Sequence, residues 1–119
     1  MKKHTISFIH AFDGLVWAFK TQPNYRIHFF LSFLSMIAGF ILKIEHYEFL
    51  IILILITVGI AIETINTSIE QTADAIDTKW RNDLKNVKDI AAGAMLFFAI
   101  GAFIIAGIIF IPKIFILLF

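Results

Sequence analysis

Four acidic side chains and an asparagine follow the most apolar run of this 119-residue chain, at spacings that fit one face of a helix. At about 100° per residue, Glu63, Glu70 and Asp74 fall within about 40° of arc, and Asn66 lies about 60° to one side. Asp77 continues the same face. Carboxylate and amide oxygens suit Mg²⁺, which also takes phosphate oxygens and water. A carboxylate that does not bind the metal can accept a proton from a hydroxyl group.

These acids lie at the edge of an apolar segment, in a chain that is too apolar for a small soluble domain. Hydrophobic residues make up 60% of it, and 14 residues are Phe, which indicates a membrane protein. Ionisable groups at a membrane edge are costly unless they pair, bind a cation or face water. For Asp77 and Asp83 we favour the simpler interpretation, solvated residues of an exit helix. For Glu63, at the bilayer end of the row, we favour a functional role.

Three apolar runs, 29–42, 49–62 and 90–111, predict three transmembrane helices. The first two runs are about 21 Å long as helices, against a hydrocarbon core of roughly 30 Å, so each must extend into its polar flanks. We therefore expect spans at about 25–43, 47–69 and 89–111. Residues 5–20 predict an amphipathic helix in the membrane interface, which ends before Pro23. The predicted fold is a single all-α membrane domain over residues 1–119.

The distribution of Lys and Arg predicts the orientation. Basic residues gather before the first span and between the second and third spans, so the N-terminus and the 63–89 segment are expected in the cytoplasm. Trp17, Tyr25 and Trp80 would then be aromatic anchors at that interface. The chain has no Cys, which excludes disulfides and thiolate metal sites. It also lacks the glycine-rich phosphate-binding loops, so helices alone would have to hold a nucleotide.

Small residues inside the predicted spans have a structural interpretation. We expect the glycines at 39, 59, 93, 101 and 107, with Ala91, Ala92 and Ala94, to allow close packing of helices.

The motif ExxNxxIE at residues 63–70, followed by Asp74 and by KDxAAGA at 88–94, resembles the prokaryotic diacylglycerol kinase and undecaprenol kinase family. In the N-terminal half, AFxG at 11–14 and KTxxNxRIH at 20–28 are more similar to the undecaprenol kinase branch. The resemblance covers nearly the whole chain. It implies a homotrimeric lipid kinase of the bacterial cytoplasmic membrane, with active sites shared between subunits and no nucleic-acid partner.

The resemblance also implies a role for each polar position. ATP would be the co-substrate and Mg²⁺ the cofactor, Glu63 would be the general base, and Glu70 would bind the metal. Asn66 would orient the base and the phosphate. The expected nucleotide contacts are Asp74, Lys88, Asp89 and Lys3. Considered alone, Lys88 is more typical of an interface anchor, and Asp89 is also typical of a helix terminus.

One position departs from the family pattern. Gln22 stands where many relatives have a second metal-binding glutamate, and an amide oxygen can ligate Mg²⁺ without contributing charge. A catalytically degenerate kinase or non-catalytic membrane scaffold is therefore an alternative. A carboxylate-lined transporter is a weaker one, since its acids would lie near the bilayer midplane. The acceptor alcohol stays open between undecaprenol and diacylglycerol, and the RIH sequence favours undecaprenol by resemblance.

Overall fold

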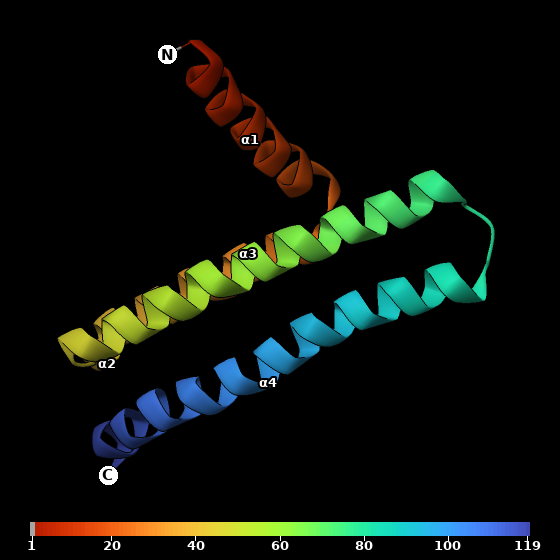
Figure 1. The fold of residues 1–119 in the computed structure, drawn as a ribbon. Coiled ribbons are helices and arrows are strands. Elements are labelled where there is room, and N and C mark those ends of the chain that lie inside the picture. Colours follow the sequence, from red (N-terminus) through yellow and green to blue (C-terminus); the bar gives the residue numbers. More distant parts are fainter. Residues whose placement is uncertain (1) are drawn as a thin grey trace.

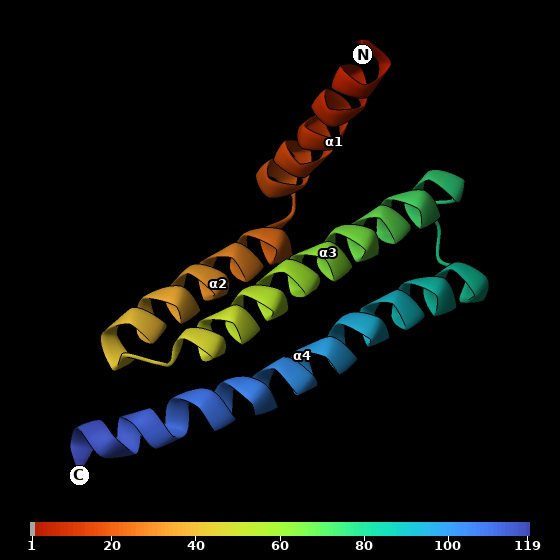
Figure 2. The ribbon, with the colours of Figure 1, turned by 60° about the vertical axis from the view of Figure 1, so that its left-hand side comes forward.

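The computed structural model describes the backbone of residues 2–119 and the side chains from residue 5 onward. Its helices are α1 (Lys2–Thr21), α2 (Pro23–Leu42), α3 (His46–Ile76) and α4 (Asn82–Leu118). Helices α2, α3 and α4 run side by side, and α1 leaves them at an angle (Figures 1 and 2). Each of those three is long and apolar enough to cross a membrane. The predicted all-α membrane fold, with an N-terminal helix and three spans, is confirmed.

The break between α1 and α2 lies at Gln22 and Pro23. Gln22 has an extended backbone (φ −109°, ψ 108°), and Pro23 occupies the first turn of α2, where its missing N–H costs no helical hydrogen bond. The Arg26 guanidinium reaches back and donates to the carbonyl oxygens of Phe19 (3.4 Å) and Lys20 (3.0 Å). These carbonyls belong to the last turn of α1, which has no further turn to bond them. Arg26 thus caps α1 from α2.

At the opposite end, a three-residue connection joins α2 to α3. Lys43 adopts the left-handed conformation (φ 52°), and the N–H of Ile44 donates to the carbonyl of Gly39 (3.1 Å), which closes the end of α2. The Glu48 carboxylate accepts the N–H of Glu45 (2.9 Å) and so caps α3. The Lys113 ammonium of α4 lies 3.8 Å from Oε1 of Glu45 and 3.8 Å from Oε1 of Glu48. All three spans are therefore fastened at this end.

Close packing depends on two of the glycines. A Cβ at Gly59 would lie 2.7 Å from Cε1 of Phe98 on α4, and one at Gly39 would lie 2.7 Å from Cε1 of Phe49 on α3. By contrast, a Cβ at Gly93 or Gly101 would meet no atom within 4 Å. The expectation of glycine-mediated packing is thus met at residues 39 and 59 and contradicted within this chain at 93 and 101.

Helix α4 is longer than the apolar run that predicted it. It begins at Asn82, several residues before the expected start at 89, and it continues through Pro112 to Leu118. Proline removes one backbone hydrogen bond inside a helix but does not stop a helix that is held on both sides. On α3 the helix likewise continues without a break through the acidic row to Ile76. Glu63, Glu70 and Asp74 therefore project from one helix, whereas Asp77, which was expected to continue their face, is the C-cap residue with an extended backbone (φ −161°, ψ 129°).

Candidate functional site

The acidic row of α3 passes from the interior of the bundle to its surface. Glu63 is 4% exposed and Asn66 is 7% exposed. One turn further on, Glu70 is partly exposed, and Asp74 is exposed. Along about 16 Å of helix the side chains thus change from an apolar setting to an aqueous one. A group that must meet both a lipid and a nucleotide needs such a gradient.

Helix α2 supplies the partners at the buried end of the row. Nε2 of His28 lies 3.6 Å from Oε2 of Glu63, and the two side chains are 27% and 6% exposed respectively. One turn earlier on the same face, the Tyr25 hydroxyl shares a 3.0 Å hydrogen bond with the hydroxyl of Thr64. Together these contacts fix the level of α2 against α3. Tyr25 is 0% exposed, so the prediction that it anchors the chain at the membrane interface is wrong.

Asn66 and Glu70 form a second polar pair, one turn along α3. The Asn66 side-chain amide donates to Oε1 of Glu70 (3.3 Å). Because a carboxylate only accepts, this bond places the NH₂ group toward Glu70 and leaves the carbonyl oxygen on the other side. That oxygen, Oδ1, is buried and has no hydrogen-bond partner. A buried acceptor without a partner is a position where a hydroxyl group or a cation can bind.

The Glu70 carboxylate suits a Mg²⁺ ion that is also bound by phosphate oxygens. Among the described residues there is no group of three or more His, Cys, Asp and Glu side chains that could hold a metal. Mg²⁺ rarely needs such a cage, because one or two carboxylates plus substrate phosphates and water complete its shell. Glu70, with substrate phosphate and water, provides that smaller donor set, while the unpartnered oxygen of Asn66 lies on the side of the amide away from Glu70.

Gln22 lies apart from this pair in the structure. It occupies the extended residue between α1 and α2, is partly exposed, and donates from Nε2 to the hydroxyl of Thr21 (3.3 Å). Within the described part of the chain, it has no hydrogen bond to Glu70. The predicted metal-binding role of Gln22 therefore has no contact in this chain to support it.

The predicted nucleotide contacts are brought together where α3 and α4 pass each other. The Lys88 ammonium of α4 forms an ion pair with the Asp74 carboxylate of α3. Lys85 and Asp89 pair along α4, with Nζ 2.5 Å from Oδ2. Lys88 and Asp89 were expected just before the third span, and instead they lie in the second turn of the longer α4. The exposed end of the acidic row, at Asp74, therefore contacts a cation of α4.

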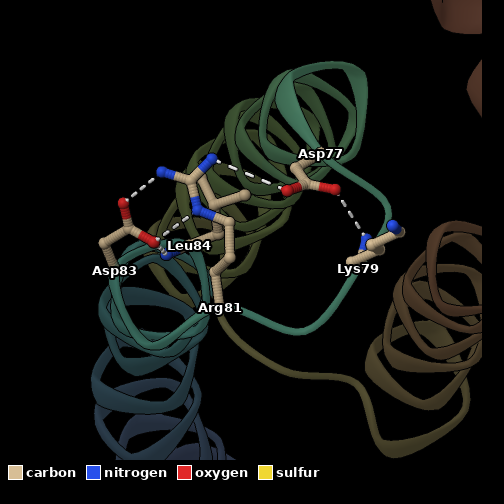
Figure 3. Close-up of polar contacts among 5 residues, drawn as sticks. All are labelled: Asp77, Lys79, Arg81, Asp83 and Leu84. Atoms are coloured by element: carbon tan, nitrogen blue, oxygen red, sulfur yellow. Dashed lines mark hydrogen bonds and ion pairs between the residues drawn. The ribbon is translucent and has the colours of Figure 1, made fainter.

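The linker between α3 and α4 is ordered by Arg81 (Figure 3). Its guanidinium donates from Nε (3.1 Å) and Nη2 (2.7 Å) to the Asp83 carboxylate, and Nη1 lies 3.7 Å from Asp77. Asp77 also accepts the backbone N–H of Lys79 (2.9 Å). The hydrogen bond from Arg81, followed by the one from the backbone N–H of Leu84, lowers the pKa of Asp83 below its usual value. The linker is thus a closed polar turn, as expected for solvated acids.

A pocket of about 270 Å³ opens beside this turn. Its charged lining consists of four cations, Lys79, Arg81, Lys85 and Lys88, and two acids, Asp77 and Asp89, and the indole of Trp80 also lines it. Trp80 is 74% exposed, so its ring is available for stacking. Cationic side chains beside an exposed aromatic ring suit an anionic group attached to a planar ring.

A second hollow, an apolar groove of about 370 Å³, runs between α2, α3 and α4. His28 stands at the end of the groove nearest Glu63, and Gly59 and Phe98 line its wall. The hydroxyls of Ser32 and Ser35 also line it, but both donate to carbonyls of their own helix (2.7 and 2.9 Å). The remaining lining is aliphatic and aromatic, which suits a hydrocarbon chain.

Two residues of the site were not identified from the sequence as such. His28 appeared only as part of the KTxxNxRIH motif, and Tyr25 only as an aromatic near a membrane edge. Their spacing of three residues at the start of an apolar run was the available signal, because it places both on one helix face. The predicted role of Lys3 lies outside the residues whose side chains the structure describes.

Comparison with known proteins agrees with this architecture. The family model described as prokaryotic diacylglycerol kinase matches residues 9–110. The chain is 37% identical over 107 residues to the undecaprenol kinase of Bacillus subtilis (strain 168), covering 90% of this chain and 87% of that protein. It is 32% identical over 109 residues to the diacylglycerol kinase of Synechocystis sp. (strain ATCC 27184 / PCC 6803 / Kazusa), covering 91% of this chain and 62% of that longer protein. With the match extending from α1 to α4 and including the acidic row, the chain belongs to the prokaryotic diacylglycerol kinase family and is a lipid kinase of the membrane.

Proposed function

We propose that this protein transfers the γ-phosphate of ATP to the hydroxyl of a membrane lipid alcohol, with Glu63 as the general base. The observation that carries the proposal is the position of Glu63. Its carboxylate is buried and lies 3.6 Å from His28, which lines one end of an apolar groove, while the row of polar residues that starts with it ends near a pocket lined by four cations. A hydrocarbon chain in the groove would bring a terminal hydroxyl to Glu63, and a nucleotide beside the linker would bring its phosphates from the other side.

The chemistry required of the chain is limited. As the alcohol oxygen bonds to the γ-phosphorus, the bond from that phosphorus to the β–γ bridging oxygen breaks and ADP leaves. Glu63 accepts the hydroxyl proton during this step, so the proton is not transferred to a phosphate oxygen. Burial supports this role, because a carboxylate without a full hydration shell accepts a proton more readily than a solvated one.

Glu70 is the proposed ligand of the Mg²⁺ that accompanies ATP, with Gln22 as a further ligand. The ion would supply charge neutralisation at the β- and γ-phosphate oxygens. Asn66 holds the Glu70 carboxylate through its NH₂ group and presents its buried carbonyl oxygen on the side away from Glu70. Asn66 thereby orients the phosphate and the acceptor relative to Glu63. Since Gln22 contributes no charge, Glu70 carries most of the metal binding.

For the nucleotide, Lys88 is the proposed phosphate contact. Its ion pair with Asp74 is partly exposed and therefore weak, so a phosphate oxygen can replace the carboxylate. Asp89 keeps Lys85 of α4 oriented, Asp74 and Asp89 contact the nucleotide, and Lys3 contributes a further cation from α1. This placement requires residues 63–89 and the N-terminus on the cytoplasmic side, where ATP is.

Enclosing both substrates requires more surface than one chain offers. The groove and the cationic pocket are both open, and most of the bulky apolar residues of α2 and α4 are exposed. We therefore propose a homotrimer in which a neighbouring subunit completes each active site. For the acceptor we favour undecaprenol over diacylglycerol, because the B. subtilis relative named as an undecaprenol kinase is matched over most of its length.

A direct assay tests the function. The purified protein in mixed micelles would be given ATP labelled at the γ-phosphate, with undecaprenol, with diacylglycerol or with no alcohol, each with Mg²⁺ or with EDTA. We expect labelled lipid only when an alcohol and Mg²⁺ are both present, and more from undecaprenol. ATP consumption without an alcohol, or no labelled lipid from either acceptor, would refute the proposal and favour a degenerate kinase or scaffold.

A further inference from the structure

His28 occupies a position that the phosphoryl-transfer scheme does not use. It projects from α2 toward Glu63 with Nε2 3.6 Å from Oε2, and it lines the head of the apolar groove. Its side chain is 27% exposed, whereas that of Glu63 is 6% exposed. The imidazole thus lies between a nearly inaccessible carboxylate and a more open part of the surface.

Glu63 needs an exit for its proton in every catalytic cycle. After the alcohol has lost its proton, the carboxyl group is neutral, and it cannot act again until it ionises. Burial disfavours the ionised form and keeps bulk water away. Of the neighbours on α3, the Asn66 amide cannot accept a proton, and Glu70 lies one turn beyond with the amide of Asn66 bonded to it.

The other elements around His28 leave Glu63 as its carboxylate partner. On α4, Met95 and Phe98 line the same groove and are uncharged. The acids of that helix, Asp83 and Asp89, pair with cations of the α3–α4 linker and α4.

Among the residues whose side chains the structure describes, three further charged residues belong to α1 and α2, and none of them competes with His28 for Glu63. On its own helix, Arg26 donates to the last carbonyls of α1. From α1, Lys20 is a cation, and Asp13 forms no ion pair with His28 in the described residues. The imidazole is therefore the proton acceptor in contact with the buried carboxylate.

We propose that His28 is a positioning residue for Glu63 that also receives its proton. This inference rests on the proposed lipid kinase function. The alcohol O–H proton passes to Oε of Glu63 as the new O–P bond forms, and then to the neutral imidazole, which becomes an imidazolium and releases the proton to water. The imidazolium also attracts the regenerated carboxylate and holds it at the head of the groove. Imidazole is suited to this step because it changes charge near neutral pH.

The test combines substitution with chemical rescue. His28→Ala should lower kcat about tenfold or more while leaving the KM for ATP near its wild-type value, because a proton-transfer contribution is lost. Added imidazole should restore turnover, more effectively at higher pH where it is a free base. His46→Ala is the matched control, since His46 is an exposed residue at the first position of α3, far from Glu63 along that helix.

A second variant keeps the proposal testable if His28→Ala does not fold. His28→Gln can hydrogen-bond but cannot carry a proton, so the acid-side fall of the kcat against pH profile should be lost or shifted in this variant. Wild-type kcat with an unchanged profile in His28→Gln, or a loss in His28→Ala that imidazole does not restore, would overturn the proposal. Absence of lipid phosphorylation by the wild-type protein would instead refute the kinase function itself.

Discussion

Replacing Glu63 by Gln removes the proposed base while keeping the size and polarity of the side chain. General-base assistance is typically worth about a hundred- to ten-thousandfold in rate, which corresponds to about 2.7–5.4 kcal/mol in the activation barrier. We expect a loss in the upper half of this range. At 4% exposure, the position of Glu63 is closed to bulk water, so no solvent base can replace the carboxylate.

Stability should not fall with activity in Glu63→Gln. Burying the ionised carboxylate carries a desolvation penalty, and its contact with His28 is long, at 3.6 Å. A neutral amide in the same space avoids that penalty. The amide loses only the weak attraction to His28, so the free energy of unfolding should not fall. The assay is the initial rate of label transfer from ATP to the lipid alcohol at saturating substrates. Thermal unfolding and gel filtration would be measured on the same detergent preparation, with an unchanged or higher melting temperature expected.

A matched control separates the base from any other acid. Glu45→Gln makes the same chemical change at the first position before α3, where the carboxylate is 63% exposed and lies near Lys113. This variant should keep its turnover. Near wild-type turnover in a folded Glu63→Gln protein would refute the assignment of the base, and an equal loss in both variants would show that the effect is not local to Glu63.

Three further substitutions address separate parts of the structure. Lys88→Met should raise the KM for ATP about ten- to a hundredfold by removing a charge-assisted contact, as measured by ATP titration, while an unchanged KM would exclude Lys88 from the nucleotide site. Gly59→Ala should destabilise the protein by about 1–3 kcal/mol because its Cβ forces Phe98 to move; Gly93→Ala, whose Cβ meets no atom within 4 Å, is its neutral control in detergent unfolding. Tyr25→Phe should cost about 0.5–1.5 kcal/mol through one lost buried hydrogen bond, and equal stability to wild type would contradict that bond.

The sequence was sufficient to predict the helices because long apolar runs separated by polar segments have few alternatives in a membrane. It was less informative about where the helices end. Asn82 to Asp89 is too polar to be recognised as part of a span, yet it continues α4 because it packs beside the polar end of α3. The predicted third span ends at about residue 111, whereas the helix continues through Pro112 to Leu118.

The sequence predicted the site residues along α3 but not the residues of α2 that face them. The 100° rotation per residue places Glu63, Glu70 and Asp74 along one side of α3 from the sequence alone. Which residues of α2 face these acids depends on how far along α3 the helix α2 begins. The periodicity of the sequence does not contain that information. For that reason His28 and Tyr25 were not recognised as neighbours of α3, whereas the acids were.

The start of α2 also explains why only the first acid of the row is buried. Proline fixes the beginning of α2 at residue 23, and the contact of Tyr25 with Thr64 aligns that beginning with the middle of α3. Beyond Thr64, α3 continues for about three turns without α2 beside it, as the views along the bundle show (Figure 2). Glu63 is therefore the last acid-bearing position of α3 that α2 covers. The break that turns α1 away from the bundle thus determines where a carboxylate can be enclosed by apolar helices and still lie two turns from the partly exposed Glu70.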